Sequence, residues 1–246
     1  MKTNPSFERR GSLLLLARTA LAARASRPEP TEVPQPPRTR RRTGYSEHHV
    51  LSPTVGQVCL PNRVSEALLA WADTEPGVCD VQLVRQVIHY QDAGKQRSTH
   101  VPLRLTLRTG AVCYWDCSPA RSDRSSQSPA VAAKRNFAQA ADADYRLFTW
   151  TFFAERRMEL SSRLALQNVL YCGRTLNTSK EEAAALLLVA KAPHTVAGLA
   201  ASIGCQESTA MLVAAKLQMQ GRVRLPLATE GLSVRWLVTW GGSDGR

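Results

Sequence analysis

A predicted β-hairpin over residues 100–118 is the feature that most restricts how this chain can fold. Two alternating segments, HVPLRLTLR and AVCYWDCS, flank Thr109-Gly110, and glycine suits the left-handed position of a three-residue loop. With Leu107 closing against Ala111, one face pairs Arg104 with Tyr114, Pro102 with Asp116 and His100 with Ser118. The opposite face collects Leu103, Leu105, Leu107, Cys113, Trp115 and Cys117. The apolar face is expected in the core, and the polar face is a candidate site.

Helix and strand signals around the hairpin predict an α/β domain over residues 47–172. Helical periodicity at Val64–Ala72 ends before Glu75-Pro76-Gly77. The other expected elements are strands at 81–90 and 145–152 and helices at 130–143 and 160–170. Turn residues at 91–94 separate the first strand from the hairpin. We expect a mixed sheet with flanking helices.

Residues 173–246 carry a different pattern, which predicts a winged helix domain. Three helices are expected at 180–191, over TVAGLAASIG and at 207–220, each ending at a Gly or Pro. RVRLPLATEGLSVRWLVTW then predicts a hairpin turning at Glu230-Gly231. Three helices followed by a hairpin is the element order of a winged helix-turn-helix.

Basic charge is concentrated in a Pro/Arg-rich arm, residues 1–46. The chain has 32 Lys and Arg against 20 Asp and Glu, a net charge of +12. Ten basic and three acidic residues give the arm +7, and repeated prolines and like charges prevent it from forming a core. We expect the arm to be disordered and to bind nucleic acid through Arg38, Arg40, Arg41 and Arg42; a solubilising tail is the alternative.

Composition also limits the cellular compartments in which this protein is expected. No apolar run reaches the roughly 18 residues that cross a bilayer, so no membrane partner is expected. Six scattered cysteines fit reduced, intracellular thiols. We expect a cytoplasmic, bacterial, nucleoid-associated protein. The segment FERRGSLLLLARTALAARA has some features of a twin-arginine export signal, but Glu8 precedes the arginine pair and arginines interrupt the apolar stretch. A short amphipathic helix on the arm is the preferred interpretation.

Three stretches resemble TnsA-type endonuclease subunits of heteromeric transposases. RRRTGYSEHHVLSPTVGQVCLPNRVSEALLAWADTEPGVCDVQLVRQVIHY resembles the family's opening, and THVPLRLTLRTGAVCYWDCSPA its catalytic stretch. DYRLFTWTFFAERRMELSSRLALQNVLYCGR is similar to the core strand and helices that follow. Together they cover about residues 40 to 175. The resemblance implies a restriction-endonuclease-like fold of the PD-(D/E)XK superfamily, with carboxylates that hold Mg²⁺.

Carried over position by position, the resemblance implies a degenerate catalytic site. Glu66 matches the helix glutamate, with Ser65 as a one-residue alternative, and Asp116 matches the second strand acid. The first strand acid falls on Pro102 and the lysine on Ser118, so neither position keeps its charge. Glu66 and Asp116 are the candidate metal ligands, and Mg²⁺ is expected only if the site is active.

Other residues near this site have ordinary interpretations beside the functional ones. His100 is a possible base or ligand, although a lone strand histidine is more often a surface residue. Cys113 and Cys117 are better explained as core residues than as metal ligands, because no second pair completes a site. Asp92 is expected to be a turn former.

The predicted recognition helix 207–220 is poorly equipped to read bases. It has one basic residue, Lys216, and only Gln206 stands near its start. Arg222 and Arg224 on the hairpin are candidate phosphate contacts. A docking or dimerisation role for this domain is therefore favoured over sequence-specific reading.

The resemblance implies a DNA transposition subunit acting on double-stranded transposon-end DNA with a DDE-type transposase and an ATPase regulator. The lost charges favour a pseudoenzyme with a bridging role, and they leave the question of enzymatic activity open. One alternative is an active metal-dependent endonuclease that cuts 5′ ends with Glu66, Asp116 and His100. A second is a winged-helix transcriptional regulator with an unrelated N-terminal domain.

Overall fold

The structure is a computed structural model that describes residues 48–84, 86–118, 127–229 and 231–241. All of them belong to the unit formed by residues 45–246. The arginines at 38 and 40–42, expected to bind DNA, lie outside the described residues.

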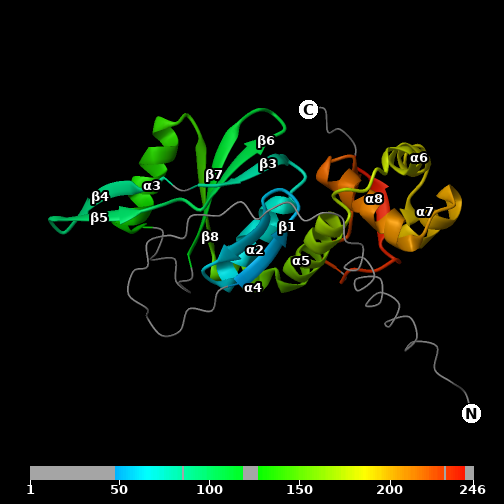
Figure 1. The fold of residues 1–246 in the computed structure, drawn as a ribbon, viewed down its shortest axis with the longest axis horizontal. Helices are drawn as coiled ribbons and strands as arrows, with labels where there is room; N and C mark the ends of the chain where they lie inside the picture. Colours follow the sequence, from blue (N-terminus) through cyan, green and yellow to red (C-terminus); the bar gives the residue numbers. More distant parts are fainter. Residues whose placement is uncertain (1–47, 85, 119–126, 230, 242–246) are drawn as a thin grey trace, which may run out of the picture. The chain divides into compact units, whose positions relative to one another are not determined.

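A four-stranded mixed sheet organises the first half of this unit (Figure 1). Its strands, in spatial order, are β3 (Val78–Leu83), β6 (Leu103–Leu107), β7 (Val112–Ser118) and β8 (Asp144–Thr149). The first three are antiparallel neighbours, whereas β7 and β8 run parallel. A parallel pair needs a crossover connection, and helix α3 (Pro129–Ala140) lies in it. The predicted α/β class is confirmed.

The predicted hairpin register is confirmed where strands β6 and β7 pair. Arg104 lies opposite Tyr114, and Leu105 lies opposite Cys113. The main-chain N–H of Leu107 donates to the carbonyl of Ala111 across 2.8 Å, and the turn glycine that follows Thr109 has φ +83°. The six residues expected on the apolar face all belong to, or pack against, one hydrophobic core. Turn chemistry and alternation therefore fix this part of the fold.

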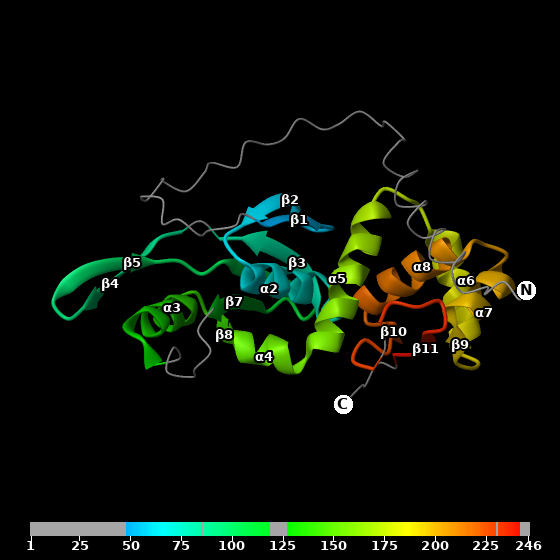
Figure 2. The same ribbon diagram turned by 90° about the horizontal axis from the view of Figure 1, so that it is seen from below.

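Helices cover both faces of the sheet (Figure 2). Helix α2 (Arg63–Asp73) packs its buried Leu68 and Trp71 into the core that contains Trp115. Helix α3 covers the other face, where its Ala138 shares a second core with Tyr114. Because side chains alternate along a strand, neighbouring residues of β7 face different helices. The polar face, expected to be a candidate site, is therefore covered by α3.

Two small hairpins stand beside the main sheet. One joins β1 (His48–Ser52) to β2 (Gly56–Leu60), and the other joins β4 (Ile88–Asp92) to β5 (Lys95–Thr99). The second hairpin corrects the single strand expected over 81–90. The strand ends at Leu83, and the chain pairs with itself again from Ile88 onward, because the polar segment 95–99 supplies a partner outside the sheet.

The strand expected over 145–152 is also shorter than predicted. It ends at Thr149, whose side chain accepts a hydrogen bond from the N–H of Phe152 and caps α4 (Trp150–Glu155). Helix α5 (Arg157–Cys172) follows and packs against α2. Aromatic residues occur in both strands and helices, so the N-cap at Thr149 decides where β8 ends and α4 begins.

The C-terminal part contains three helices and a small sheet. The elements are α6 (Ser179–Val189), β9 (His194–Thr195), α7 (Val196–Ile203), α8 (Glu207–Met219), β10 (Val223–Arg224) and β11 (Leu237–Trp240). The three helices agree with those expected from the sequence. The sheet order is β10-β11-β9, and the predicted final hairpin is limited to the pairs Val223–Trp240 and Arg224–Thr239. The expected turn at 230–231 includes residue 230, which lies outside the described residues.

Arg108 ties the two parts of the unit together. Its guanidinium donates to the carbonyl of Pro76 across 3.0 Å and also to the carbonyl of Met219 at the end of α8. The side chain thus bridges the β6–β7 turn and the C-terminal part. Within the described ranges, no single helix is long and apolar enough to span a membrane; α7 and α8 meet that criterion only jointly, across a bend of 111°.

Candidate functional site

Asp116 is the centre of a buried polar cluster on β7. Its Oδ2 atom accepts hydrogen bonds from Lys134 Nζ at 2.6 Å and from the hydroxyl of Tyr145 at 2.8 Å. Its Oδ1 atom accepts from the main-chain N–H of Cys117 at 2.8 Å. The side chains of Asp116 and Lys134 are 4% and 13% exposed. Both carboxylate oxygens are therefore occupied by donors from the protein itself.

The secondary structure explains why these three side chains meet. Strand β8 runs parallel to β7 and places Tyr145 directly beside Tyr114, two residues before Asp116 on the same face. Helix α3 crosses this face, and its Lys134 lies one turn before the buried Ala138. The lysine stem covers apolar surface while the ammonium reaches the carboxylate.

Burial and charge keep the phenol of Tyr145 protonated. Burial raises the pKa of Tyr145, and the negative charge and hydrogen bond of Asp116 raise it further, because both oppose ionisation of the phenol. Tyr145 therefore stays a neutral donor. The ammonium of Lys134 balances the charge of Asp116. A metal ion could approach Asp116 only by displacing this ammonium.

Glu66 lies in a different environment, on the first turn of α2. The helix begins at Asn62, whose side-chain oxygen accepts from the N–H groups of Val64 and Ser65, each at 3.0 Å. Glu66 is about a third exposed, and its Oε2 lies 3.5 Å from Nδ1 of His48. A carboxylate in the first turn also interacts favourably with the helix dipole.

The two expected catalytic acids are not brought together by their described contacts. Helix α2 covers the face of β7 that carries Cys117, whose Sγ lies 3.6 Å from Oγ of Ser65. Asp116 points to the opposite face, beneath α3. Among the described residues, no group of three or more His, Cys, Asp and Glu side chains is placed to hold a metal ion. The expected magnesium site at Glu66 and Asp116 thus has no geometric support.

The remaining positions of the expected site lie at the end of the hairpin. Pro102 is half-buried, and its carbonyl accepts from the N–H of Val84 at 2.9 Å, one residue beyond the last β6–β7 pair. Ser118 pairs with Thr149 on β8. His100 is exposed in the segment between β5 and β6 and is not part of the sheet. The predicted pair of His100 and Ser118 is therefore not formed in the ladder.

The two thiols of β7 are core residues, as predicted. Cys113 is buried, and Cys117 packs against the same core. Burial raises the pKa of the Cys117 thiol to about 11. A thiol that stays protonated at neutral pH is a poor nucleophile and a poor ligand.

The candidate recognition helix, α8, is buried along most of its length. Nearly all side chains from Ala210 to Gln218 are buried. Helices α6 and α7 of the C-terminal part pack on α8, and so does α5, which precedes that part in the chain. Lys216 donates to the carbonyl of Leu176 and to the hydroxyl of Thr178, each at 2.8 Å. Its one cation is thus engaged internally. The exposed start of α8, where a recognition helix contacts bases, carries Gln206, Glu207 and Ser208 and has no cation.

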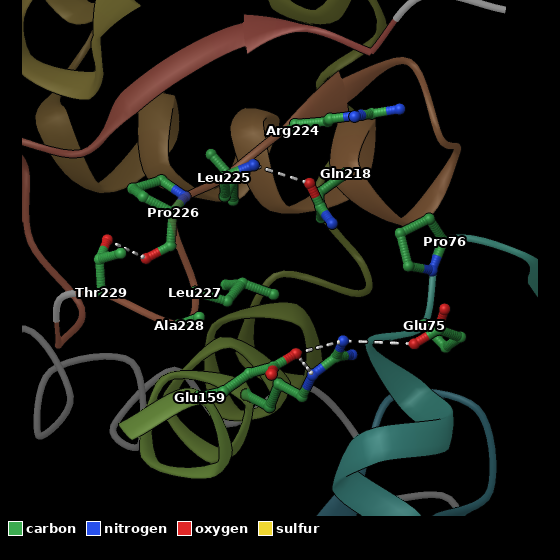
Figure 3. Close-up of a pocket in the computed structure, with 11 residues that line it drawn as sticks. Glu75, Pro76, Glu159, Gln218, Arg224, Leu225, Pro226, Leu227, Ala228 and Thr229 are labelled. Carbon is green, nitrogen blue, oxygen red and sulfur yellow. Dashed lines mark hydrogen bonds and ion pairs between the residues drawn. The ribbon is translucent and has the colours of Figure 1, made fainter. Parts of the chain in front are cut away.

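Arg222 and Arg224, the other residues expected to bind DNA, are exposed on and beside β10. Arg224 lines a cavity of about 360 Å³ between the end of α2, α5 and the loop after β10 (Figure 3). Arg163, another charged residue in the lining, contacts Glu159 at 2.8 Å and Glu75 at 3.2 Å. The charge of Arg163 is therefore balanced by two carboxylates. The cavity lies where helices and a loop pack against one another, and we do not assign it a ligand.

Lys134, Tyr145 and Arg163 were not singled out by the sequence. Lys134 lies in a helix with ordinary surface spacing, and Tyr145 opens an apolar strand. The parallel register of β7 and β8 would have revealed the tyrosine, but that pairing is set by a crossover that the sequence does not specify. No family model matches this chain, and a search of curated proteins found no match. The function is therefore argued from the residues and their geometry.

Proposed function

We propose that this protein is a DNA-binding subunit of a heteromeric transposase, similar to TnsA-type subunits, in which the nuclease site is closed. The closed nuclease site is inferred from the hydrogen bonds that Lys134 and Tyr145 donate to the carboxylate of Asp116. Both oxygens of the Asp116 carboxylate are bonded within the protein, and Glu66 lies on α2, which covers the other face of the sheet. Asp116 then stabilises the fold and does not bind a metal ion. The protein then acts as an architectural component beside an active DDE-type transposase and an ATPase regulator.

The order of elements supports the nuclease-like part of this proposal. Helix α2, the turn at Glu75-Pro76, strand β3, the β6–β7 hairpin, strand β8 and helices α4 and α5 follow one another as the resemblance requires. The three helices and small sheet of the C-terminal part are compatible with a winged helix domain. In this proposal the sheet is an inherited scaffold, and its degenerate site no longer holds Mg²⁺.

The DNA-binding part rests on charge. The arm carries +7 of the chain's net +12, so it is the main electrostatic footprint for phosphate. The exposed start of α8 has an acidic residue, Glu207, and no cation, which argues against operator reading by the C-terminal part and hence against the transcriptional regulator. Contacts to DNA are then largely independent of sequence, and selection of transposon ends falls to the partner subunits.

Recovery of crosslinked complexes from the host tests this function. A tagged full-length chain is crosslinked, captured and analysed by DNA sequencing and mass spectrometry. We expect enrichment at the ends of a mobile element, together with a DDE-type transposase and an ATPase. Enrichment at promoters without those proteins would support the regulator and overturn the proposal.

A further inference from the structure

The β4–β5 hairpin is a ribbon that projects beyond α3 (Figures 1 and 2). Its five ladder pairs run from Ile88–Thr99 to Asp92–Lys95, so each strand is about 17 Å long. Only Ile88 is buried among its strand residues, and most of β5 is exposed. A ribbon with so little apolar contact is not explained by core formation.

The ribbon has two chemically distinct faces because its side chains alternate. The inner face begins with Ile88, which packs against Ala138 of α3. The outer face consists of two cross-strand pairs, His89 with Ser98 and Gln91 with Gln96, and all four residues are exposed. Each of these side chains can donate or accept hydrogen bonds, and none is an aliphatic or aromatic anchor of the kind that dominates protein interfaces.

Charge at the edge of the ribbon favours an anionic partner. Lys95 and Arg97 lie on β5 and are exposed. Asp92 is the one acidic residue between positions 86 and 103, and its Oδ2 lies 3.0 Å from Nε of Arg97. This exposed ion pair holds the guanidinium beside the tip at little energetic cost. Lys95 lies opposite Asp92 and Arg97 opposite Tyr90, so both cations are on the Ile88 face of the ribbon, behind the hydrogen-bonding face. Their long side chains can extend past the strands toward the walls of a groove that holds the ribbon.

We propose that the β4–β5 ribbon inserts into the major groove of duplex DNA, with Lys95 and Arg97 on phosphates and Gln91 and Gln96 toward base edges. The groove is about 12 Å wide and admits a two-stranded ribbon. Glutamine is suited to adenine edges, and lysine and arginine to phosphate. The ribbon residues lie outside the basic arm in the sequence, and the inference rests on the proposed DNA-binding function.

A titration of the full chain with a labelled duplex of roughly 20 base pairs tests the ribbon. The test variant is Lys95→Ala/Arg97→Ala. The matched control is Lys180→Ala/Lys191→Ala, which removes the same charge from exposed positions at the two ends of α6. We expect the ribbon variant to lower the slope of log affinity against log salt by about 2. The control should bind like the wild type.

A duplex RNA of the same sequence separates groove insertion from general attraction to phosphate. The A-form major groove is too narrow for side chains to read, so the ribbon substitutions should weaken RNA binding less than DNA binding. The variant Gln91→Ala/Gln96→Ala should keep the salt slope and reduce the difference in affinity between A·T-rich and G·C-rich DNA. Equal losses on both nucleic acids would overturn groove insertion.

The outcomes distinguish the two proposals. If the wild type binds no DNA, the proposed function fails. If it binds and the ribbon variant matches the control, only the ribbon assignment is wrong. Circular dichroism and thermal unfolding verify that each variant is folded. We expect each to be folded because every substituted side chain is exposed.

Discussion

Lys134 Nζ lies 2.6 Å from Oδ2 of Asp116, beneath helix α3 and on the face of the sheet that α2 does not cover. This relationship decides the chemistry of the centre. A carboxylate that could have bound a cation is neutralised by the protein's own ammonium. The pair also fastens α3 to the sheet. The same contact thus serves stability and closes the site.

Loss of the ammonium should be costly for folding. Lys134→Ala leaves the carboxylate of Asp116 buried without its counter-charge, and we expect the free energy of unfolding to fall by about 3 to 5 kcal/mol. Urea denaturation measures this. The exposed Lys191→Ala is the control, and its change should stay within about 0.5 kcal/mol. A loss for Lys134→Ala no larger than the control's would show that the pair is not buried as described.

Tyr145 should give the protein a distinct alkaline limit. The pKa of Tyr145 is raised in the folded state, so its contribution to stability is complete below the unfolded pKa near 10.0 and is lost as pH rises above that value. Tyr145→Phe removes the titrating group and should flatten the decline above about pH 10, while lowering stability at neutral pH. Urea unfolding across this range provides the measurement. An unchanged alkaline decline would contradict the assignment.

The junction of α5 and α8 depends on a glycine. A Cβ atom at Gly173 would lie 2.3 Å from Cδ1 of Leu212, so Gly173→Ala forces the leucine or α8 to move. We expect a loss of about 1 to 3 kcal/mol in the free energy of unfolding. At Gly77 a Cβ atom meets nothing within 4 Å, so Gly77→Ala is the control and should be nearly neutral. Equal effects would mean that the two helices are not in close contact.

The tip of the ribbon carries strain that a substitution can relieve. Ala93 has φ +49° and Gly94 has φ +75°, the combination of a type I′ turn, which favours Asn or Gly at the first position. Ala93→Asn should stabilise the hairpin by about 0.5 to 1 kcal/mol, measured by denaturation or by amide exchange in β4 and β5. A destabilised variant would contradict this turn geometry.

Local sequence signals predicted much of the fold but little of the buried polar cluster around Asp116. Alternation and Gly110 set the register of β6 and β7, and Asn62 caps a helix where the periodicity predicts one. The break after Leu83 was missed because an apolar segment continues on both sides of it, and only the partner strand decides where pairing stops. The contact of Asp116 with Lys134 joins residues 18 positions apart across a crossover, and no local pattern encodes it.

Plasmid nicking tests the central claim most directly. The full-length wild type, Glu66→Ala and Asp116→Asn are incubated with supercoiled DNA in Mg²⁺ or Mn²⁺. A closed site predicts that all three proteins leave the plasmid intact while the wild type still binds it. Metal-dependent cutting by the wild type that disappears in both variants would contradict the account.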